Sequence, residues 1–120
     1  MKLKMHLIWP ALGFIAMGCS NNSTADLLEP SPVGIVSYAR DIKPIIDNNC
    51  LGCHKSPPEN GAPMSLANYE SLKDAITNRP LIDRISRDQG AEGMMPLGGT
   101  RLPQSSINLI ALWKAQGMQP

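Results

Sequence analysis

The stretch Cys50-Leu51-Gly52-Cys53-His54 has the spacing C-x-x-C-H, which is typical of covalent attachment of a c-type haem. Two thiols three residues apart in a turn can each add to one vinyl group along a haem edge. The residue after the second thiol then lies under the iron, where the imidazole of His54 can act as the proximal ligand. The sequence therefore predicts one haem c, bound through Cys50 and Cys53 and ligated by His54.

Other chemistries use the same residue types. A structural zinc site needs four protein ligands, and downstream of the first 19 residues the chain offers only Cys50, Cys53 and His54. A thioredoxin-like C-x-x-C lies in a β-α-β setting, and no segment here alternates like a strand. A plain disulfide would leave His54 without a role. Haem attachment is the preferred interpretation, and the metal site and the disulfide stay open as alternatives.

Residues 1–18 have the features of an export signal. A basic start with Lys2 and Lys4 precedes an uncharged run from Leu7 to Gly18, which is shorter than the ~20 apolar residues that cross a bilayer. The following Cys19 completes a segment that resembles a bacterial lipobox, which implies a lipid on this cysteine. Ala16 and Gly18 also suit an ordinary export peptidase, so cleavage without lipidation stays open.

Residues 1–20 also predict where in the cell the protein is located. We expect an exported protein, either periplasmic or on the cell surface, and attached to a membrane through the lipid on Cys19. Ser20 stands where an aspartate often retains lipoproteins in the inner membrane, so the resemblance favours the outer membrane. Residues 19–36 are polar and contain Pro30 and Pro32, so they are predicted to form a flexible tether.

Residues 37–120 are expected to form a single domain. Without Lys2 and Lys4 the basic residues fall from 11 to nine, against ten acidic residues, which gives a net charge of −1. Such a balance gives no reason to expect a nucleic-acid partner. After residue 18 the aromatic residues are only Tyr38, Tyr69 and Trp113. So small an aromatic content is typical of a thin core that needs a cofactor.

The periodicity of apolar residues predicts an all-α domain. Asp41 is the expected N-cap of the first helix, which tolerates Pro44 in its first turn after a looser segment at 37–40. Asn68 is the expected cap of the second helix. The four predicted helices cover residues 41–49, 69–77, 80–87 and a last helix that begins at Pro103 or Ser105 and ends at Gly117. Residues 55–66 and 88–103 are rich in Gly and Pro and are predicted to be loops.

The second axial ligand is expected to be a methionine. With His54 as the only histidine after the export signal, one chain cannot supply two histidine ligands, and methionine is the other common choice. Met64 lies only ten residues past His54, and Met118 lies at a terminus that can fray. Met94 and Met95 follow His54 by 40 and 41 residues, in a Gly-rich loop long enough to reach the other face of a haem.

Residues 38–120 resemble a class I cytochrome c domain of the short bacterial kind. The resemblance rests on Tyr38–Ile45 before the C-x-x-C-H stretch, on Met95-Pro96 with Gly98-Gly99, and on Ile110–Trp113 with Gly117. It implies about four short helices wrapped around one haem, with Met95, which directly precedes Pro96, as the distal ligand. It also implies that the first and last helices cross near the haem, through Ile42, Ile46, Ile110 and Trp113.

The expected function is electron transfer by Fe(II)/Fe(III) cycling, without enzymatic activity and without a small-molecule substrate. Its partners would be redox proteins, and its lipid would keep it at a membrane. A haem subunit of a larger oxidoreductase and a peroxide- or gas-binding protein with a labile methionine ligand are the alternatives. Arg84 is a candidate for a haem propionate or for a solvated surface. A further set of cations is either a guide for a redox partner or merely solubilising: Lys43, Lys55 and Lys73.

Overall fold

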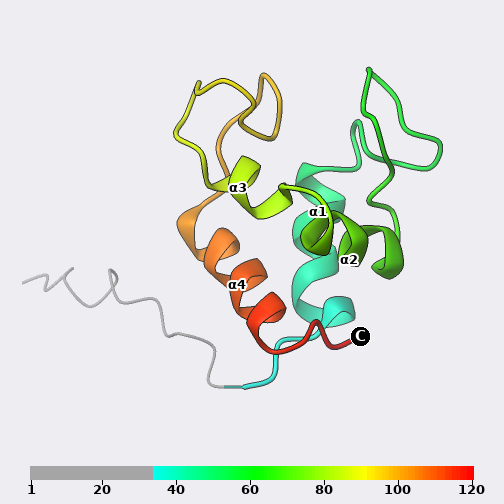
Figure 1. The fold of residues 1–120 in the computed structure, drawn as a ribbon, viewed down its shortest axis with the longest axis vertical. Coiled ribbons are helices and arrows are strands. Elements are labelled where there is room, and N and C mark those ends of the chain that lie inside the picture. The colour runs from blue at the N-terminus through cyan, green and yellow to red at the C-terminus, as the bar shows by residue number, and fades with distance from the viewer. Residues whose placement is uncertain (1–33) are drawn as a thin grey trace, which may run out of the picture.

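The computed structural model describes residues 34–120, and the export signal, Cys19 and most of the predicted tether lie outside the described residues. The described part is helical and contains no strand, so the all-α prediction is confirmed there; one isolated bridge pairs Ser37 with Gln119. The elements, drawn in Figure 1, are the π-helical segment η2 (Tyr38–Ile42) and the helices α1 (Lys43–Asn49), α2 (Tyr69–Thr77), α3 (Leu81–Ser86) and α4 (Gln104–Ala115).

The first helix starts earlier than predicted, because Ser37 and not Asp41 is its N-cap. The Ser37 hydroxyl accepts from the N–H of Arg40, and the Asp41 carboxylate accepts in return from the N–H of Ser37 at 2.8 Å. The turn is π-helical, with the N–H of Lys43 donating to the carbonyl of Tyr38. This wider turn suits Pro44, which has no N–H and would crowd the carbonyl four residues back in an α-helix.

The remaining helices lie close to their predicted positions. Helix α2 has the predicted bounds, and its N-terminus is a capping box in which Asn68 and Ser71 bond each other's backbone N–H groups. Helix α3 is one residue shorter than predicted at each end, and Pro80 is its N-cap. Helix α4 begins at Gln104, after Pro103 as N-cap, so neither predicted start is correct. Gly117 follows its end with a φ of 87°, a conformation that favours glycine.

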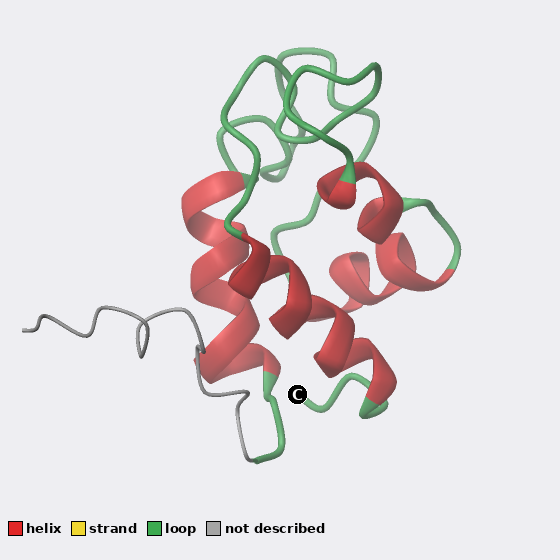
Figure 2. Ribbon diagram, turned by 90° about the vertical axis from the view of Figure 1, so that its left-hand side faces the viewer, coloured by secondary structure: helices red, strands yellow, loops and turns green. Residues whose placement is uncertain are grey.

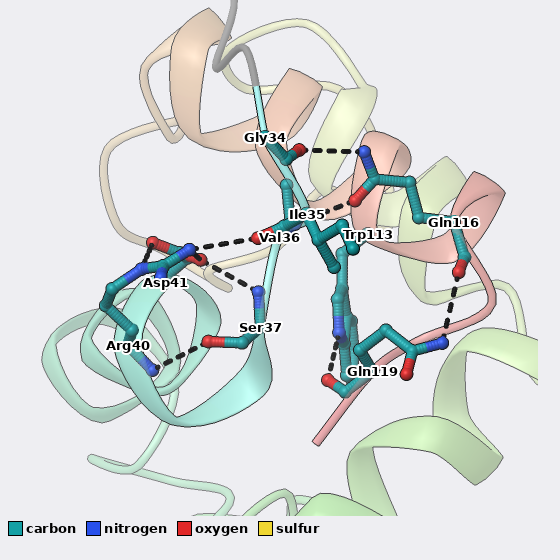
Figure 3. A network of polar contacts seen from close by, with 9 residues as sticks. All are labelled: Gly34, Ile35, Val36, Ser37, Arg40, Asp41, Trp113, Gln116 and Gln119. Atoms are coloured by element: carbon teal, nitrogen blue, oxygen red, sulfur yellow. Dashed lines mark hydrogen bonds and ion pairs between the residues drawn. The ribbon is translucent and has the colours of Figure 1, made fainter.

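The two ends of the described chain are clamped together (Figure 3). The side-chain amide of Gln116 accepts from Val36 N–H at 2.7 Å and donates to the carbonyl of Gly34 at 3.0 Å. The indole Nε1 of Trp113 donates to the carbonyl of Gln119 at 2.7 Å. Residues 34–36 are therefore held against the C-terminal segment.

The core is shared by η2 and the four helices, and loop residues such as Leu66 and Leu102 also belong to it. Ile42, Ile46, Ile110 and Trp113, which were expected at the contact of the first and last helices, are all buried in it. The rings of Tyr38, Tyr69 and Trp113 pack against one another with centroids 5.5 to 6.0 Å apart. Trp113 is fully buried, which fits a packing role for this side chain.

The molecule has a helical end and a loop end. The long loop between α1 and α2 and the loop between α3 and α4 both extend at one end, while residues 34–37 and the C-terminus lie at the other (Figures 1 and 2). Within residues 34–120 no helix is long and apolar enough to cross a membrane. The loop end carries the residues that the sequence singles out.

Candidate functional site

The C-x-x-C-H stretch forms a tight turn at the end of α1. The N–H of Cys50 closes the helix on the carbonyl of Ile46 at 2.8 Å. The carbonyl of Cys50 then accepts from the N–H of Cys53 at 3.2 Å and from the N–H of His54 at 2.9 Å. These bonds bring the two thiols and the imidazole into one turn, as their spacing predicts.

The ring of His54 is oriented by a backbone carbonyl. Its Nδ1 lies 2.8 Å from the carbonyl oxygen of Met64. Because a carbonyl can only accept, Nδ1 is the donor, and in the neutral imidazole Nε2 then keeps a lone pair for a metal. The carbonyl of His54 also accepts from Leu66 N–H at 2.7 Å, so the loop from 55 to 66 holds the histidine from both sides. Such outer contacts fix the tautomer and raise the basicity of a metal-bound imidazole.

A cavity of about 390 Å³ opens beside this turn, within the size range of small-molecule and cofactor sites. Cys50, Cys53, His54 and Met95 all line it. Aliphatic side chains from several elements complete its wall: Ile46, Leu66, Leu81, Ile85, Leu102 and Ile110. An apolar cavity lined by two thiols, one imidazole and the thioethers of Met64 and Met95 contains the donor set that a covalently bound haem requires.

Of the four methionine candidates, Met64 and Met95 line the cavity, and Met94 and Met118 do not. Met95 lines the cavity, and its N–H donates to the carbonyl of Arg84 in α3 at 3.1 Å. Met94 is buried but does not line the cavity, and neither does Met118, whose carbonyl accepts from the hydroxyl of Tyr69. Met64 lines the cavity beside His54, to which its carbonyl is bonded.

Two arginines give the cavity a cationic rim. Arg79 lines it while paired with Asp74, at 3.4 Å between Nε and Oδ2. Arg84 also lines it, and its guanidinium donates to the carbonyl of Gly93 at 3.1 Å. Within residues 34–120 Arg84 forms no ion pair. Its charge is therefore free to meet an anionic group in the cavity.

The two cysteines differ in their surroundings. Both are free thiols; Cys53 is exposed, and Cys50 is half-buried. Burial raises the pKa of the Cys50 thiol to about 11, because the thiolate is poorly solvated there. Reactive redox cysteines have the opposite shift, toward a stable thiolate at neutral pH. The described residues also contain no cluster of three or more His, Cys, Asp or Glu that would hold a metal ion alone.

The three lysines that were considered as guides for a partner do not form one group. Lys43 pairs with Asp47 and Lys55 pairs with Glu59, both one helical turn apart in sequence. Lys73 lies over the ring of Tyr69, 5.6 Å from its centroid. These contacts are those of ordinary surface cations.

Comparison with protein-family models, with curated proteins and with solved structures gave no match for this chain. The functional argument therefore rests on the residues of the site. Sequence reasoning missed the Met64 carbonyl as the partner of His54, because every residue carries a carbonyl and none is visible in a motif. It also missed Arg79 in the cavity wall, and the side chains of Gln89 and Arg101 that brace the loop carrying Met95.

Proposed function

We propose that this protein is a monohaem electron carrier of the class I cytochrome c type. The observation that carries the proposal is the convergence of Cys50, Cys53, His54 and Met95 on one apolar cavity. Met95 comes from a loop more than 40 residues away from the C-x-x-C-H turn, so the fold and not the spacing brings it there. Neither a disulfide nor a structural zinc site requires an apolar cavity of this kind beside its residues.

Each residue has a distinct task in this proposal. Cys50 and Cys53 would each hold the haem by a thioether, formed when a thiol S–H adds across one vinyl double bond. His54, held by the Met64 carbonyl, would supply Nε2 to the iron, and Met95 would supply its thioether sulfur from the loop between α3 and α4. When bound, the haem supplies one-electron Fe(III)/Fe(II) chemistry. The aliphatic wall excludes water, and the methionine ligand favours the reduced state.

Arg84 is the proposed partner of a haem propionate. A guanidinium beside an apolar cavity keeps its charge, and a carboxylate is the anion that its planar fork fits best. Arg84 has the position and the free charge for this pairing, and its second contact with Gly93 orients it. Arg79 is already paired with Asp74, so it is the less available cation.

The composition of the cavity wall favours a carrier over an enzyme. No carboxylate and no second imidazole line the described cavity, so peroxide chemistry would lack the usual acid–base group. With His54 and Met95 both bound, the iron would have no open position for a substrate. The predicted lipid on Cys19 belongs to the same proposal: the chain enters the domain at the helical end, away from the loops of the site (Figure 1).

Carbon monoxide distinguishes this function from gas or peroxide binding. We expect the reduced holoprotein to bind CO slowly and incompletely at neutral pH, because Met95 occupies the distal position. A Met95→Ala variant serves as the positive control and should bind CO rapidly. Rapid binding by the unmodified protein would favour the gas-binding alternative. Reversible reduction and reoxidation without loss of the spectrum is the companion result expected of a carrier.

A further inference from the structure

The loop that carries Met95 has no regular structure of its own. It spans the residues between α3 and α4, and its internal backbone bonds are few: Ala91 N–H to Asp88, Met94 N–H to Ala91 and Gly99 N–H to Pro96. Its position must therefore come largely from side chains that tie it to the helices. Two side chains stand at the two ends of the loop: Arg101 bonds it to α3 and α4, and Gln89 bonds its two arms to each other.

Arg101 binds the end of α3 from the far side of the loop. Its Nε donates to the carbonyl of Arg87 at 3.0 Å, and its Nη2 donates to the carbonyl of Ser86 at 3.3 Å. The same Nη2 lies 2.8 Å from Oε1 of Gln104, in the first turn of α4. The carbonyls at a helix C-terminus lack partners within the helix, so one guanidinium both satisfies them and joins α3 to α4.

The side-chain amide of Gln89 joins the two ends of the same loop. Its Nε2 donates to the carbonyl of Gly99 at 3.0 Å, and its Oε1 accepts from the N–H of Arg101 at 2.7 Å. The amide thus bridges the outgoing and the returning arms of the loop. In all these contacts the partners of Arg101 are neutral oxygens, so the brace depends on the shape of the guanidinium fork more than on charge.

The end of α3 that Arg101 binds also holds Met95, through the carbonyl of Arg84. Arg84, in the last turn of α3, accepts from Met95 N–H at 3.1 Å and donates to Gly93 at 3.1 Å. We propose that Arg101, with Gln89, is a latch that sets how firmly Met95 holds the iron. This inference rests on the proposed function. Loosening the latch raises the population in which Met95 has left the iron, without removing any ligand.

Competition by imidazole measures that population in the ferric holoprotein. Arg101→Gln should raise the apparent imidazole affinity about tenfold, the equilibrium equivalent of one lost hydrogen bond from a charged donor. Arg101→Lys should raise it similarly, because one ammonium group cannot reach all the acceptors. Gln89→Ala changes a more exposed side chain and should act in the same direction, with the fold intact.

Arg40→Gln is the matched control. It removes an arginine with comparable contacts at the helical end, where Arg40 bonds Asp41 and the carbonyl of Ile35, and it should leave imidazole affinity unchanged. Thermal unfolding of all variants separates a general loss of stability from a specific loss of the Met95 ligand. Unchanged affinity in both Arg101→Gln and Gln89→Ala would overturn the latch, as would an equal rise in Arg40→Gln.

The outcome for the latch is distinct from the outcome for the proposed function. An unmodified protein with haem and a methionine–iron band but no response to Arg101→Gln would remain a carrier without a latch. Full rescue by Arg101→Lys would overturn the role of the guanidinium fork. An unmodified protein without the methionine–iron band would overturn the ligand assignment and the latch together.

Discussion

His54 shows how one side chain serves both the fold and the chemistry. Its Nδ1 is bonded to the Met64 carbonyl, which ties the loop after the C-x-x-C-H turn to the ring. In the neutral ring the same bond leaves the lone pair on Nε2, which is what a metal ligand requires. The loop therefore orients the histidine as the proposed iron ligation would need.

Met95 and Met94 form a natural pair of test and control. Met95→Ala should abolish the methionine–iron absorption band and lower the midpoint potential, by on the order of 100 mV within the ~0.8 V range that axial ligands control. Met94→Ala removes a buried side chain that does not line the cavity, so it should keep the band and lose only stability. Visible spectra and redox titrations check both. Loss of the band in Met94→Ala alone would reverse the assignment.

At the residue scale, the sequence predicts which residues meet at the candidate site better than it predicts the residues that hold them in place. Cys50, Cys53 and His54 follow from spacing, because local geometry alone brings them together. Elimination narrowed the distal ligand to Met94 or Met95 but did not separate neighbours, since adjacent side chains differ only in the direction that the fold gives them. Resemblance favoured Met95, and the structure places Met95 in the cavity wall. Arg101 had no signal in the sequence, because its partners are backbone carbonyls and glutamine amides, which form no motif.

The start of the first helix illustrates the limit at the element scale. Ser37 and Asp41 are both good capping residues, and the sequence analysis assigned the cap to Asp41. The structure uses both residues, one from each side of a π-helical turn that accommodates Pro44. A pattern built on α-helical spacing cannot anticipate such a turn. Helix α2, with an ordinary capping box and no proline, was predicted with its observed bounds.

Asp41 makes this cap sensitive to acid. Hydrogen bonds from the Arg40 guanidinium and from Ser37 N–H lower the pKa of Asp41 below its ordinary value of 3.8. A lowered folded-state pKa contributes stability above pH 3.8, and this contribution is lost as the pH falls through the folded pKa. Asp41→Asn should therefore unfold at a slightly lower Tm at neutral pH.

The dependence of Tm on pH tests this prediction. The Tm difference between the unmodified protein and Asp41→Asn should shrink as the pH falls below 3.8 and through the lowered folded-state pKa of Asp41. Asp88→Asn is the control, because the Asp88 side chain has no hydrogen bond or ion pair within the described residues. A difference that persists undiminished at low pH would show that the Asp41 charge is not the cause.

At the scale of the whole molecule, the aromatic cluster and the candidate site lie at different ends of one hydrophobic core. All three aromatic rings of the described residues gather where the helices cross, and none of them lines the cavity. The clamp between residues 34–37 and the C-terminal residues closes this same end (Figure 3). The loop end is left with aliphatic walls around an open volume. The scarcity of aromatic residues fits the proposed haem, which would complete the core at this end.

The intact mass and visible spectrum of the mature, membrane-extracted protein test the central claim most directly. We expect a chain that begins at Cys19 and carries a diacylglyceryl lipid and one covalently bound haem, with a ferric spectrum that contains the methionine–iron band. A Cys50→Ala/Cys53→Ala double variant should lack the covalent haem. A mature protein without added haem mass, or with haem but without the methionine–iron band, would contradict a His54/Met95-ligated haem c.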